Sequence, residues 1–394
     1  MIALQGTTRR VSELKHKLRT ATLPKPLKTP PQNAPIVVAG LFRTASGIGQ
    51  SARACFDGLV THGLDPIAVD LSMPFNQVDT PLEEALGDMP SKSGILLLHV
   101  NAPETEPALI KLGLSRLRRW HVVGYWAWEL PVPRPDWLPA TRYLSEIWTP
   151  STFVTNAFQS AVDIPVKTAP HFVRPPIQQI ARSVHESNAP ICLLMADGRS
   201  SFHRKNVLGG IRMFRNALVD RPDARLTVKL RNIDDYPAFN AAIQEEIGND
   251  ARVTVLNGSV PSAERWSILS RHNILLSPHR SEGFGLHIAE AMALGSCVVA
   301  TGWSGNLEFM SPDTSVLLPY TLEPASDPFG VYDPPEGAVW AAVDEAAAIS
   351  ALQALAADPD RRRALGKAAK AHITMTLNGS AYVEGLETAA HASG

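Results

Sequence analysis

Two glutamates, Glu282 and Glu290, are the residues of this chain whose types and spacing best suit ligand chemistry. Glu282 follows the short apolar run Ile274–Leu276, which is typical of a buried strand, and Glu290 falls within the helical spacing beyond it. Open α/β sheets bind ligands beyond the carboxyl ends of their strands, so both carboxylates are expected at one crevice. Carboxylates accept hydrogen bonds from hydroxyl groups. The pair therefore predicts a sugar or ribose site, with a solvated loop glutamate and an unrelated helix glutamate as the alternative.

The loop between this strand and the helix is rich in glycine. Gly283 and Gly285 bracket Phe284, and the helical spacing starts at Leu286. Glycines lack a Cβ, so backbone N–H groups can approach a bound ligand closely. Gly295 is expected to end the helix, before a further strand over residues 297–301.

A second group of candidate residues is basic. The strand expected over Ile191–Met195 is followed by the run GRSSFHRK, with Arg199 in a loop and Lys205 at the start of a helix. The N-terminus of a helix adds positive potential. A diphosphate is the natural ligand for this arrangement, and a solvated basic patch is the alternative. Arg204 is an extra cation whose role the sequence leaves open.

The run EGFGLHIAEAMALG followed by CVVAT, together with GRSSFHRK, resembles the motifs of retaining GT-B glycosyltransferases of the large glycosyltransferase family 4 type (glycosyl transferases group 1). That family includes mannosyl- and glucosyltransferases of bacterial surface polysaccharides. The resemblance covers most of residues 36–385 and is more specific in the second half. It implies an α/β chain with the GT-B fold, in which two Rossmann-like domains face each other across a cleft.

The resemblance also implies roles. Glu282 and His99 would contact the transferred sugar, Glu290 would bind the ribose, and Arg199 and Lys205 would neutralise the leaving diphosphate. The other donor contacts that it implies come from four loops: Gly47 and Gly49; Asn257 and Gly258; Gly283, Phe284, Gly285 and Leu286; and Gly305, Asn306, Leu307 and Glu308.

The first half leaves other interpretations open. Gly47, Gly49 and Ala52 mimic a dinucleotide-binding fingerprint. Asp70 falls where that fingerprint places its acidic residue, although the loop before Gly47 is long for the tight turn required. A nicotinamide-dependent oxidoreductase therefore stays an alternative. His99, on an apolar strand, could equally be a core histidine.

Five tryptophans gather between residues 120 and 148. Aromatic faces stack on pyranose rings, so Trp126, Trp128 and the neighbouring Glu129 are candidates for the acceptor side of the cleft. Large aromatic side chains also fill cores, and we expect most of the five tryptophans to do so. Ser151 is expected to cap a helix.

Composition limits the class of protein. A chain of 394 residues predicts two domains, and a net charge of -1 argues against a nucleic-acid partner. The three cysteines lie among apolar residues, which fits a reducing compartment. No run approaches the roughly 20 apolar residues that cross a bilayer, and the N-terminus lacks an apolar signal-peptide core. We therefore expect a cytoplasmic protein.

Changes in composition suggest the domain boundaries. Residues 1–35, basic and rich in proline, are expected to form a flexible arm, which could contact an anionic membrane or stay solvated. A proline-rich hinge at Pro165–Pro176 separates an acceptor-side domain, 36–175, from a nucleotide-sugar-binding domain, 176–372. By resemblance, residues 373–394 form a helix that returns to the first domain.

Later segments carry less chemistry. We expect a loop at Pro319–Pro335 and helices over Val339–Ala356 and Arg361–Ile373. Asp358 and Asp360 have the Asp-x-Asp spacing that holds metals elsewhere, but their place before a helix favours capping. We expect no metal and no cofactor besides the nucleotide sugar.

The prediction is a retaining, metal-independent hexosyltransferase. It would move a mannose- or glucose-type sugar from a nucleoside diphosphate to a saccharide or lipid-linked saccharide, in surface polysaccharide or lipopolysaccharide synthesis. A GT-B epimerase or phosphorylase, the oxidoreductase and an inactive saccharide-binding subunit stay alternatives. The sequence identifies neither the base, the acceptor nor the oligomeric state.

Overall fold

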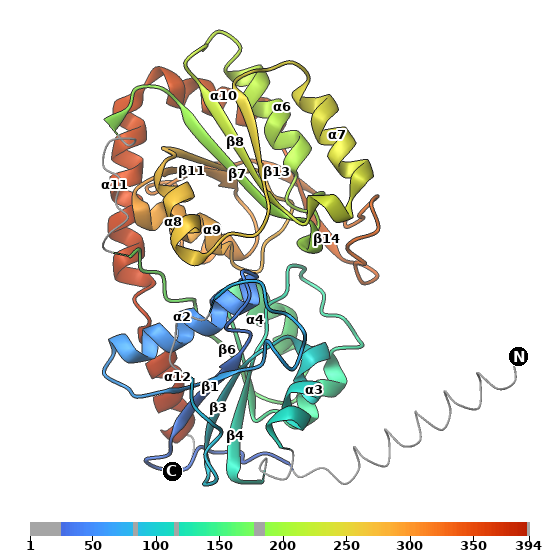
Figure 1. The fold of residues 1–394 in the computed structure, drawn as a ribbon, viewed down its shortest axis with the longest axis vertical. Helices are drawn as coiled ribbons and strands as arrows, with labels where there is room; N and C mark the ends of the chain where they lie inside the picture. The colour runs from blue at the N-terminus through green and yellow to red at the C-terminus, as the bar shows by residue number, and fades with distance from the viewer. Residues whose placement is uncertain (1–24, 82–85, 114–117, 177–185, 392–394) are drawn as a thin grey trace, which may run out of the picture.

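Two parallel sheets, one above the other in Figure 1, organise the chain. The computed structural model describes residues 25–81, 86–113, 118–176 and 186–391, so most of the basic arm expected at the N-terminus lies outside the described residues. The first sheet has the order β2-β1-β3-β4-β5-β6. Its strands are β1 Ile36–Gly40, β2 Ile67–Asp70, β3 Gly94–His99, β4 Trp120–Tyr125, β5 Glu146–Thr149 and β6 Val166–Thr168.

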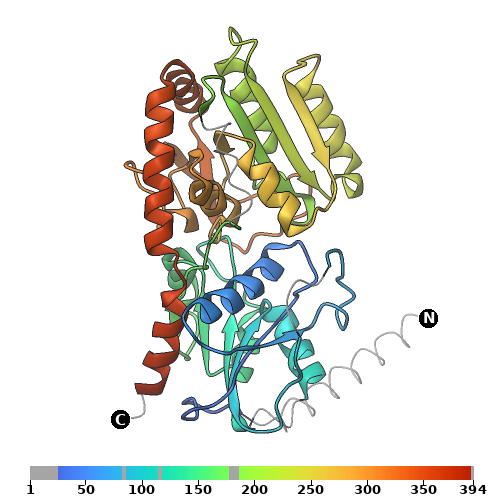
Figure 2. The ribbon, with the colours of Figure 1, turned by 60° about the vertical axis from the view of Figure 1, so that its left-hand side comes forward.

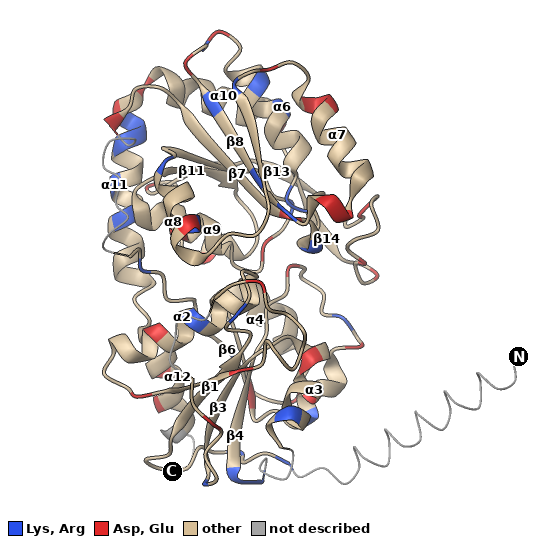
Figure 3. Ribbon diagram, viewed as in Figure 1, with Lys and Arg blue, Asp and Glu red and all other residues tan. Residues whose placement is uncertain are grey.

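The second sheet has the order β12-β11-β10-β7-β8-β9. Its strands are β7 Ile191–Asp197, β8 Arg225–Arg231, β9 Val253–Asn257, β10 Ile274–Ser277, β11 Cys297–Thr301 and β12 Val316–Leu318. Strands β3, β4, β10 and β11 are buried along their whole length, as parallel strands covered on both faces must be. Charged residues accordingly gather on helices and at strand ends (Figure 3).

Helices cover both sheets, which confirms the prediction of two Rossmann-like domains. The N-terminal domain carries α2 Gly47–Thr61, α3 Ala102–Leu112, η2 Leu138–Tyr143 and α4 Thr152–Gln159. The C-terminal domain carries η4 Gly198–Ser200, α6 Val207–Ala217, η5 Ile233–Asp235, α7 Pro237–Ile247, α8 Ser262–Ser270, α9 Leu286–Leu294, η6 Gly305–Glu308, α10 Glu345–Ala357 and α11 Pro359–Thr376. Ser151 caps α4, its Oγ accepting from the backbone N–H of Val154.

The last helix, α12 Ser380–His391, continues α11 along the edge of the molecule and packs on the N-terminal domain (Figure 2). The ring of Tyr382 is fully buried and stacks on Trp148 at 6.5 Å between centroids. Beside it, a Cβ at Gly58 of α2 would come within 3.0 Å of the Tyr382 ring. The two helices can therefore approach this closely because α2 has a glycine at the contact.

A hairpin between β12 and α10 differs from the prediction. Strands β13 Tyr320–Pro324 and β14 Val339–Val343 pair antiparallel, so the loop expected at 319–335 contains a strand and the helix expected from Val339 begins only at Glu345. Val339 and Trp340 favour extended backbone, and Asp344 caps the helix that follows. Trp340 is buried in the same cluster as the N-terminal core, so the hairpin joins the two domains.

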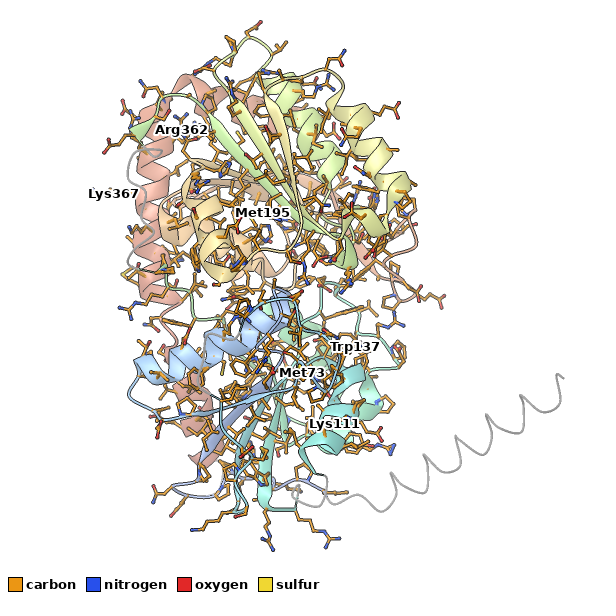
Figure 4. The ribbon with its side chains drawn as sticks, in the orientation of Figure 1. Met73, Lys111, Trp137, Met195, Arg362 and Lys367 are labelled. Atoms are coloured by element: carbon orange, nitrogen blue, oxygen red, sulfur yellow. The ribbon has the colours of Figure 1, made fainter. Side chains whose placement is uncertain are left out.

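The basic run on α11 is only partly solvated. Lys367 extends outward from the helix, as expected, whereas Arg362 is buried (Figure 4). The Arg362 guanidinium donates to the carbonyl oxygens of Leu355 at 2.9 Å and Ser187 at 2.8 Å. Asp358 caps α11 through the N–H of Arg361.

Replacing Tyr382 by alanine should loosen α12 from the N-terminal domain. Emptying the space of a buried aromatic ring typically costs about 3–5 kcal/mol, so the free energy of unfolding in urea should fall by about that amount. Tyr382→Phe keeps the ring and should lose far less. Equal losses for the two variants would show that the ring does not hold the helix.

Candidate functional site

A cleft of about 880 Å³ lies between the two domains, where the carboxyl ends of both sheets meet. The N-terminal wall comes from the loops after β1, β2, β3 and β4. The C-terminal wall comes from the loops after β7, β8, β9 and β10. Parallel α/β sheets bind ligands at this edge.

Glu282 lies on the C-terminal wall, in the loop between β10 and α9. Its Oε1 is 2.5 Å from the Lys205 ammonium and 3.6 Å from the Arg204 guanidinium. Burial opposes ionisation of this carboxyl, but the two cations outweigh it and hold its pKa well below its usual range. The backbone N–H of Glu282 donates to Ser304 Oγ at 2.9 Å, which fixes the loop. Glu282 is therefore a charged, oriented acceptor for hydroxyl groups.

Arg204 is the residue that the sequence left without a role, and it is the most enclosed cation of the cleft. Only 1% of its surface is exposed. Its guanidinium donates to the Ser281 carbonyl at 2.5 Å and to Ser200 Oγ at 2.6 Å. On the other side it lies 3.6 Å from Glu129 of the N-terminal domain. Arg204 thus links both domains to the motif glutamate, and nothing in its sequence context distinguished it from a surface arginine.

Glu129 is the acceptor-side candidate that the structure places on the cleft wall. Its Oε2 accepts a hydrogen bond of 2.9 Å from the hydroxyl of Tyr332, in the hairpin between β13 and β14. The backbone carbonyl of Glu129 accepts from Ser281 Oγ. The carboxylate is therefore held in place from the opposite domain.

Arg199 and Lys205 occupy different environments. Lys205 is nearly enclosed beside Glu282, and burial lowers the pKa of its ammonium while Glu282 opposes the shift. Arg199 lies in η4 with an exposed side chain on the cleft wall. It makes no ion pair with any residue of the described ranges. Its guanidinium can thus move onto an anion without breaking an ion pair with any described residue.

The structure corrects the place of Glu290. This side chain is 2% exposed and does not line the cleft. Its Oε2 instead pairs with the guanidinium of Arg265, which lines the cleft and donates to Gln50 of the N-terminal domain at 3.1 Å. Burial raises the pKa of the Glu290 carboxyl, and Arg265 opposes that rise. A charge at a buried helix position needs a partner, and no feature of the sequence indicated that Arg265 supplies it.

His99 occupies the core position that was the alternative to a contact with the donor sugar. It is 1% exposed, behind the cleft wall, with its Nδ1 2.8 Å from Ser51 Oγ and its ring stacked on Tyr125 at 4.5 Å. Burial holds its pKa well below the usual range, so the ring is neutral. The wall itself is formed by Tyr125 and His171. His99 supports that wall and does not reach into the cleft.

The first glycine loop divides into a lining part and a packing part. Gly47, at the start of α2, lines the cleft and has open space where a Cβ would stand. At Gly49 a Cβ would come within 2.5 Å of the Thr44 carbonyl, so this glycine serves backbone packing and not ligand contact. Ser46 caps the helix by accepting from the N–H of Gly49.

Asp70 is already engaged. Its Oδ2 lies 3.1 Å from the Arg43 guanidinium, and its Oδ1 accepts from the N–H of Ser72 at 2.9 Å. A dinucleotide fingerprint needs this carboxylate for the ribose hydroxyl. The arrangement therefore disfavours the oxidoreductase alternative.

Two tryptophans proposed for acceptor stacking belong to the core. Trp126 is 0% exposed and packs edge-on against Trp137 and Phe158. Trp128 packs between Trp137 and Tyr332 and donates its indole N–H to the Val132 carbonyl at 2.8 Å. Neither lines the cleft. Their large apolar rings are needed to close the core beneath the loop that carries Glu129.

The loops implied to contact the donor are only partly at the cleft. Gly283, Phe284, Gly285 and Leu286 line it, and so does Gly258. Gly283 lies so close to the N-terminal domain that a Cβ would be 2.6 Å from the Trp128 carbonyl, and Gly285 has a φ of +89°. Asn257 does not line the cleft, because its amide donates to Asp234 at 2.9 Å.

The loop from Gly305 to Glu308 also lies away from the cleft. A Cβ at Gly305 would overlap the Gly283 carbonyl, and the Asn306 amide donates to the Thr301 carbonyl at 2.9 Å. Leu307 is exposed. Glu308 accepts from the N–H of Thr152 at 2.7 Å, at the start of α4 in the other domain. These four residues support the motif loop and join the domains.

Several lining residues had no signal in the sequence analysis. On the C-terminal wall they are Lys229, Arg231 and Arg265, and on the N-terminal wall Asn101 and Glu104. Arg231 lies 3.3 Å from Asp197 and pairs with Asp79 across the cleft. Lys229 donates to the Leu230 carbonyl at 3.0 Å. Each of these residues lies near the end of a strand or in the first turn of a helix, positions that bring side chains to this edge of the sheet.

One segment of the C-terminal domain matches a known protein family. Residues 193–325 match the model of a family described as Glycosyl transferases group 1. This segment, about a third of the chain, is similar to glycosyltransferase group 1 domains. It contains Lys205, Glu282 and the cleft wall around them. No curated protein sequence matches the chain significantly.

Solved structures confirm the GT-B fold. Sucrose-phosphate synthase from Thermosynechococcus elongatus is 16% identical with a TM-score of 0.61, over 90% of this chain and 98% of that one. Anabaena HepE in complex with UDP and glucose is 13% identical with a TM-score of 0.58, over 91% and 100%. A mutant of S. aureus TarM in complex with fondaparinux, alpha-GlcNAc-glycerol and UDP is 11% identical with a TM-score of 0.54. That match covers 75% of this chain and 55% of TarM.

Two features are absent from the described residues. No helix within them is long and apolar enough to cross a membrane. Nor do they contain a group of three or more His, Cys, Asp or Glu side chains placed to hold a metal ion.

Arg204→Ala should destabilise the protein far more than Arg199→Ala. Removing the enclosed guanidinium leaves Glu129 and Glu282 without their shared partner, a loss of about 3–5 kcal/mol for a broken buried pair. The exposed Arg199 should change stability by less than about 0.5 kcal/mol. Urea unfolding of both variants measures the difference, and similar midpoints would contradict the linking role of Arg204.

His171 should make the protein sensitive to acid. Burial lowers its pKa to about 3, so below its unfolded pKa of about 6.5 the unfolded chain binds a proton that the folded chain does not. Stability is therefore lost as the pH falls below about 6.5, by about 2 kcal/mol at pH 5 from this residue. His171→Gln should remove that part of the loss between pH 7.5 and pH 5 in urea unfolding. An unchanged pH slope would show that His171 is protonated in the folded state.

Proposed function

We propose that this chain is a retaining, metal-independent hexosyltransferase that uses a nucleoside-diphosphate sugar of the mannose or glucose type and a saccharide acceptor. The observation that carries the proposal is the contact of Lys205 with Glu282 beside Arg204, at the cleft edge of the segment that matches the glycosyltransferase group 1 family. A sugar nucleotide has hydroxyls for the carboxylate and a diphosphate for the cations. The cleft offers both kinds of group on one wall.

Lys205 and Arg199 act on the departing diphosphate. As the bond between the anomeric carbon and the phosphate oxygen breaks, negative charge grows on that oxygen. Cations fixed before the reaction stabilise this charge without reorganisation, and they favour the transition state over bound substrate. The N-terminus of α2, at Gly47, adds partial positive charge from the opposite wall.

Glu282 positions the sugar. Its ionised carboxylate accepts hydrogen bonds from ring hydroxyls, while the backbone of Gly283 to Leu286 approaches the phosphates. The Lys205 ammonium contacts both Glu282 and the incoming diphosphate, so it lies between the sugar and the phosphates of the donor. This arrangement orients the anomeric carbon toward the N-terminal wall.

The ribose subsite is proposed to include Arg265. Arg265 lines the cleft and Glu290 lies behind it, so the nucleoside contacts the Arg265 guanidinium first. The pairing with Glu290 sets the orientation of that guanidinium. Rearrangement of the pair would let the carboxylate accept from the ribose hydroxyls.

Transfer with retention needs no dedicated base. The acceptor oxygen bonds the anomeric carbon on the face that the phosphate leaves, and its proton passes to the departing phosphate oxygen. The proposal therefore assigns no side chain to proton removal and no metal to the diphosphate.

The structural neighbours suggest the wider role. HepE was solved with UDP and glucose, and the TarM mutant with UDP and saccharide ligands. We place the reaction in surface polysaccharide or lipopolysaccharide synthesis, in the cytoplasm, with a lipid-linked saccharide acceptor and a membrane contact through the basic N-terminal arm as further parts of the proposal.

Calorimetric titration with UDP, GDP, ADP and NAD, with a chelator present, tests the donor assignment. One nucleoside diphosphate should bind tightly despite the chelator, and Glu290→Ala should weaken its binding. Binding of NAD alone would support the oxidoreductase, and binding that requires a divalent metal would contradict metal independence. Analysis of the product formed from the matching sugar nucleotide then separates transfer from epimerisation and shows the anomeric configuration.

Lys205→Ala should lower turnover by about 100-fold or more, because removing one preorganised stabilising group typically costs that much. The circular dichroism spectrum should stay that of the wild type. Arg215, a partly exposed arginine of α6 outside the cleft, gives a matched control as Arg215→Ala, which should keep turnover near wild type. Near-normal turnover of Lys205→Ala would refute the diphosphate assignment.

A further inference from the structure

The lysines and arginines of the cleft are confined to one of its two walls, which also carries Asp197 and Glu282. All the lysines and arginines that line the cleft belong to the C-terminal domain: Arg199, Arg204, Lys205, Lys229, Arg231 and Arg265. Among the described residues, the N-terminal wall contributes no lysine or arginine and three carboxylates, Asp79, Glu104 and Glu129. A ligand that spans the cleft therefore meets cations at one end and carboxylates at the other.

Two of the three carboxylates are neutralised across the cleft. Asp79 pairs with Arg231 and also accepts from the N–H of Ala45 at 2.7 Å. Glu129 lies 3.6 Å from Arg204. These two groups belong to bridges between the domains and are not free to receive a ligand.

Glu104 has no such partner. It lies in the first turn of α3, half-buried on the cleft wall, and its carboxylate makes no ion pair or hydrogen bond with the side chain of any described residue. Burial raises the pKa of this carboxyl, and a backbone hydrogen bond within Glu104 itself opposes the rise. The nearby Asn101 uses its side-chain oxygen to accept from the N–H of Ala127 at 2.9 Å. Its amide group donates to none of the described residues, so a free acceptor and a free donor stand near each other.

Among the described residues, no lysine, arginine or protonated histidine on this wall offsets Glu104. His171 is neutral, because burial lowers its pKa to about 3. The N-terminus of α3 carries partial positive charge, but Glu104 itself occupies that first turn and cancels it. An anionic ligand at this wall would face a carboxylate without a compensating cation, and like charges that close repel.

We propose that the acceptor is an uncharged or amino-bearing saccharide, and that Glu104 with Asn101 binds its hydroxyl or amino groups. Sugar phosphates and uronic acids are excluded from the acceptor subsite by the charge of Glu104. This inference rests on the proposed transferase function, since it assumes that the donor occupies the C-terminal wall and leaves the N-terminal wall to the acceptor.

Saturation-transfer NMR on the protein loaded with UDP tests the proposal, with GDP or ADP used instead if it binds more tightly. The probes are two matched pairs: methyl α-glucoside against methyl α-glucuronide, and glucose against glucose 6-phosphate. The uncharged member of each pair should bind at least tenfold more tightly. Glu104→Gln removes the charge but keeps the shape, and it should reduce that ratio at least threefold.

Glu106→Gln provides the control. It removes a carboxylate from the same helix two residues further on, about 200° around the axis, and Glu106 does not line the cleft. This variant should keep the wild-type ratio. A ratio near one in the wild type, an unchanged ratio in Glu104→Gln, or no binding of any of the sugars to the loaded protein would overturn the proposal.

The calorimetric titrations with nucleotides separate a failure of this proposal from a failure of the proposed function. If no nucleoside diphosphate binds the wild type, the transferase proposal itself fails. If a nucleotide binds and methyl α-glucuronide binds the loaded protein as tightly as methyl α-glucoside, only the role of Glu104 fails. Glu104→Gln should bind UDP within twofold of the wild-type affinity, because Glu104 lies on the wall opposite the cations.

Discussion

The enclosed guanidinium of Arg204 is the constraint on which the cleft depends. It lies within 3.6 Å of a carboxylate from each domain, Glu129 on one side and Glu282 on the other. Burying a charge is unfavourable unless partners and hydrogen bonds compensate for the lost water. Here the compensating groups come from both halves of the chain, so the buried charge is fully satisfied only when the domains are together.

Other features of the cleft follow from this contact. The Ser281 carbonyl that accepts from Arg204 belongs to the same loop as Glu282, and the Ser281 hydroxyl donates back to the Glu129 backbone. The hydroxyl of Tyr332 then donates to the Glu129 carboxylate, and the centroid of its ring lies 5.7 Å from the guanidinium carbon of Arg204. The hairpin that carries Tyr332 also packs on its own domain, where Glu323 pairs with Arg280 at 2.5 Å and Phe329 meets Phe239 at 4.8 Å between ring centroids. Its position makes sense as a brace for the charge between the domains.

The sequence allowed several strands and the principal motif to be predicted, because both rest on local signals, whereas β4, β5, β6 and β12 were missed. Buried parallel strands appear as short apolar runs, and the strand over residues 297–301 was placed with its observed bounds. The bounds of others differ by one or two residues, since ladder hydrogen bonds extend past the last apolar side chain. The segment from Val339 failed because its alanines resemble a helix, whereas pairing with β13 over a long sequence separation decides the outcome.

The side chains of the site were harder to assign than its loops. Trp126 and His99 are of types that bind sugars elsewhere, and only burial shows that they face the core. Arg265 and Arg204 are of types common on surfaces, and only their distances to Glu290 and Glu282 reveal their importance. Residue type and spacing locate a loop at the sheet edge, but they do not say which way each side chain turns within it.

The route of the chain between the domains has a mechanical consequence. It passes from one domain to the other after β6 and returns between α11 and α12, and the two passages are bonded to each other, the N–H of Val173 donating to the Leu377 carbonyl at 3.0 Å. A single tether would allow the halves to swivel as well as to bend. Two tethers fastened side by side resist torsion and leave bending as the easy motion. The domains should therefore separate by bending about an axis near Val173 and Leu377. Each closing should then return Glu129 to the same position against Arg204.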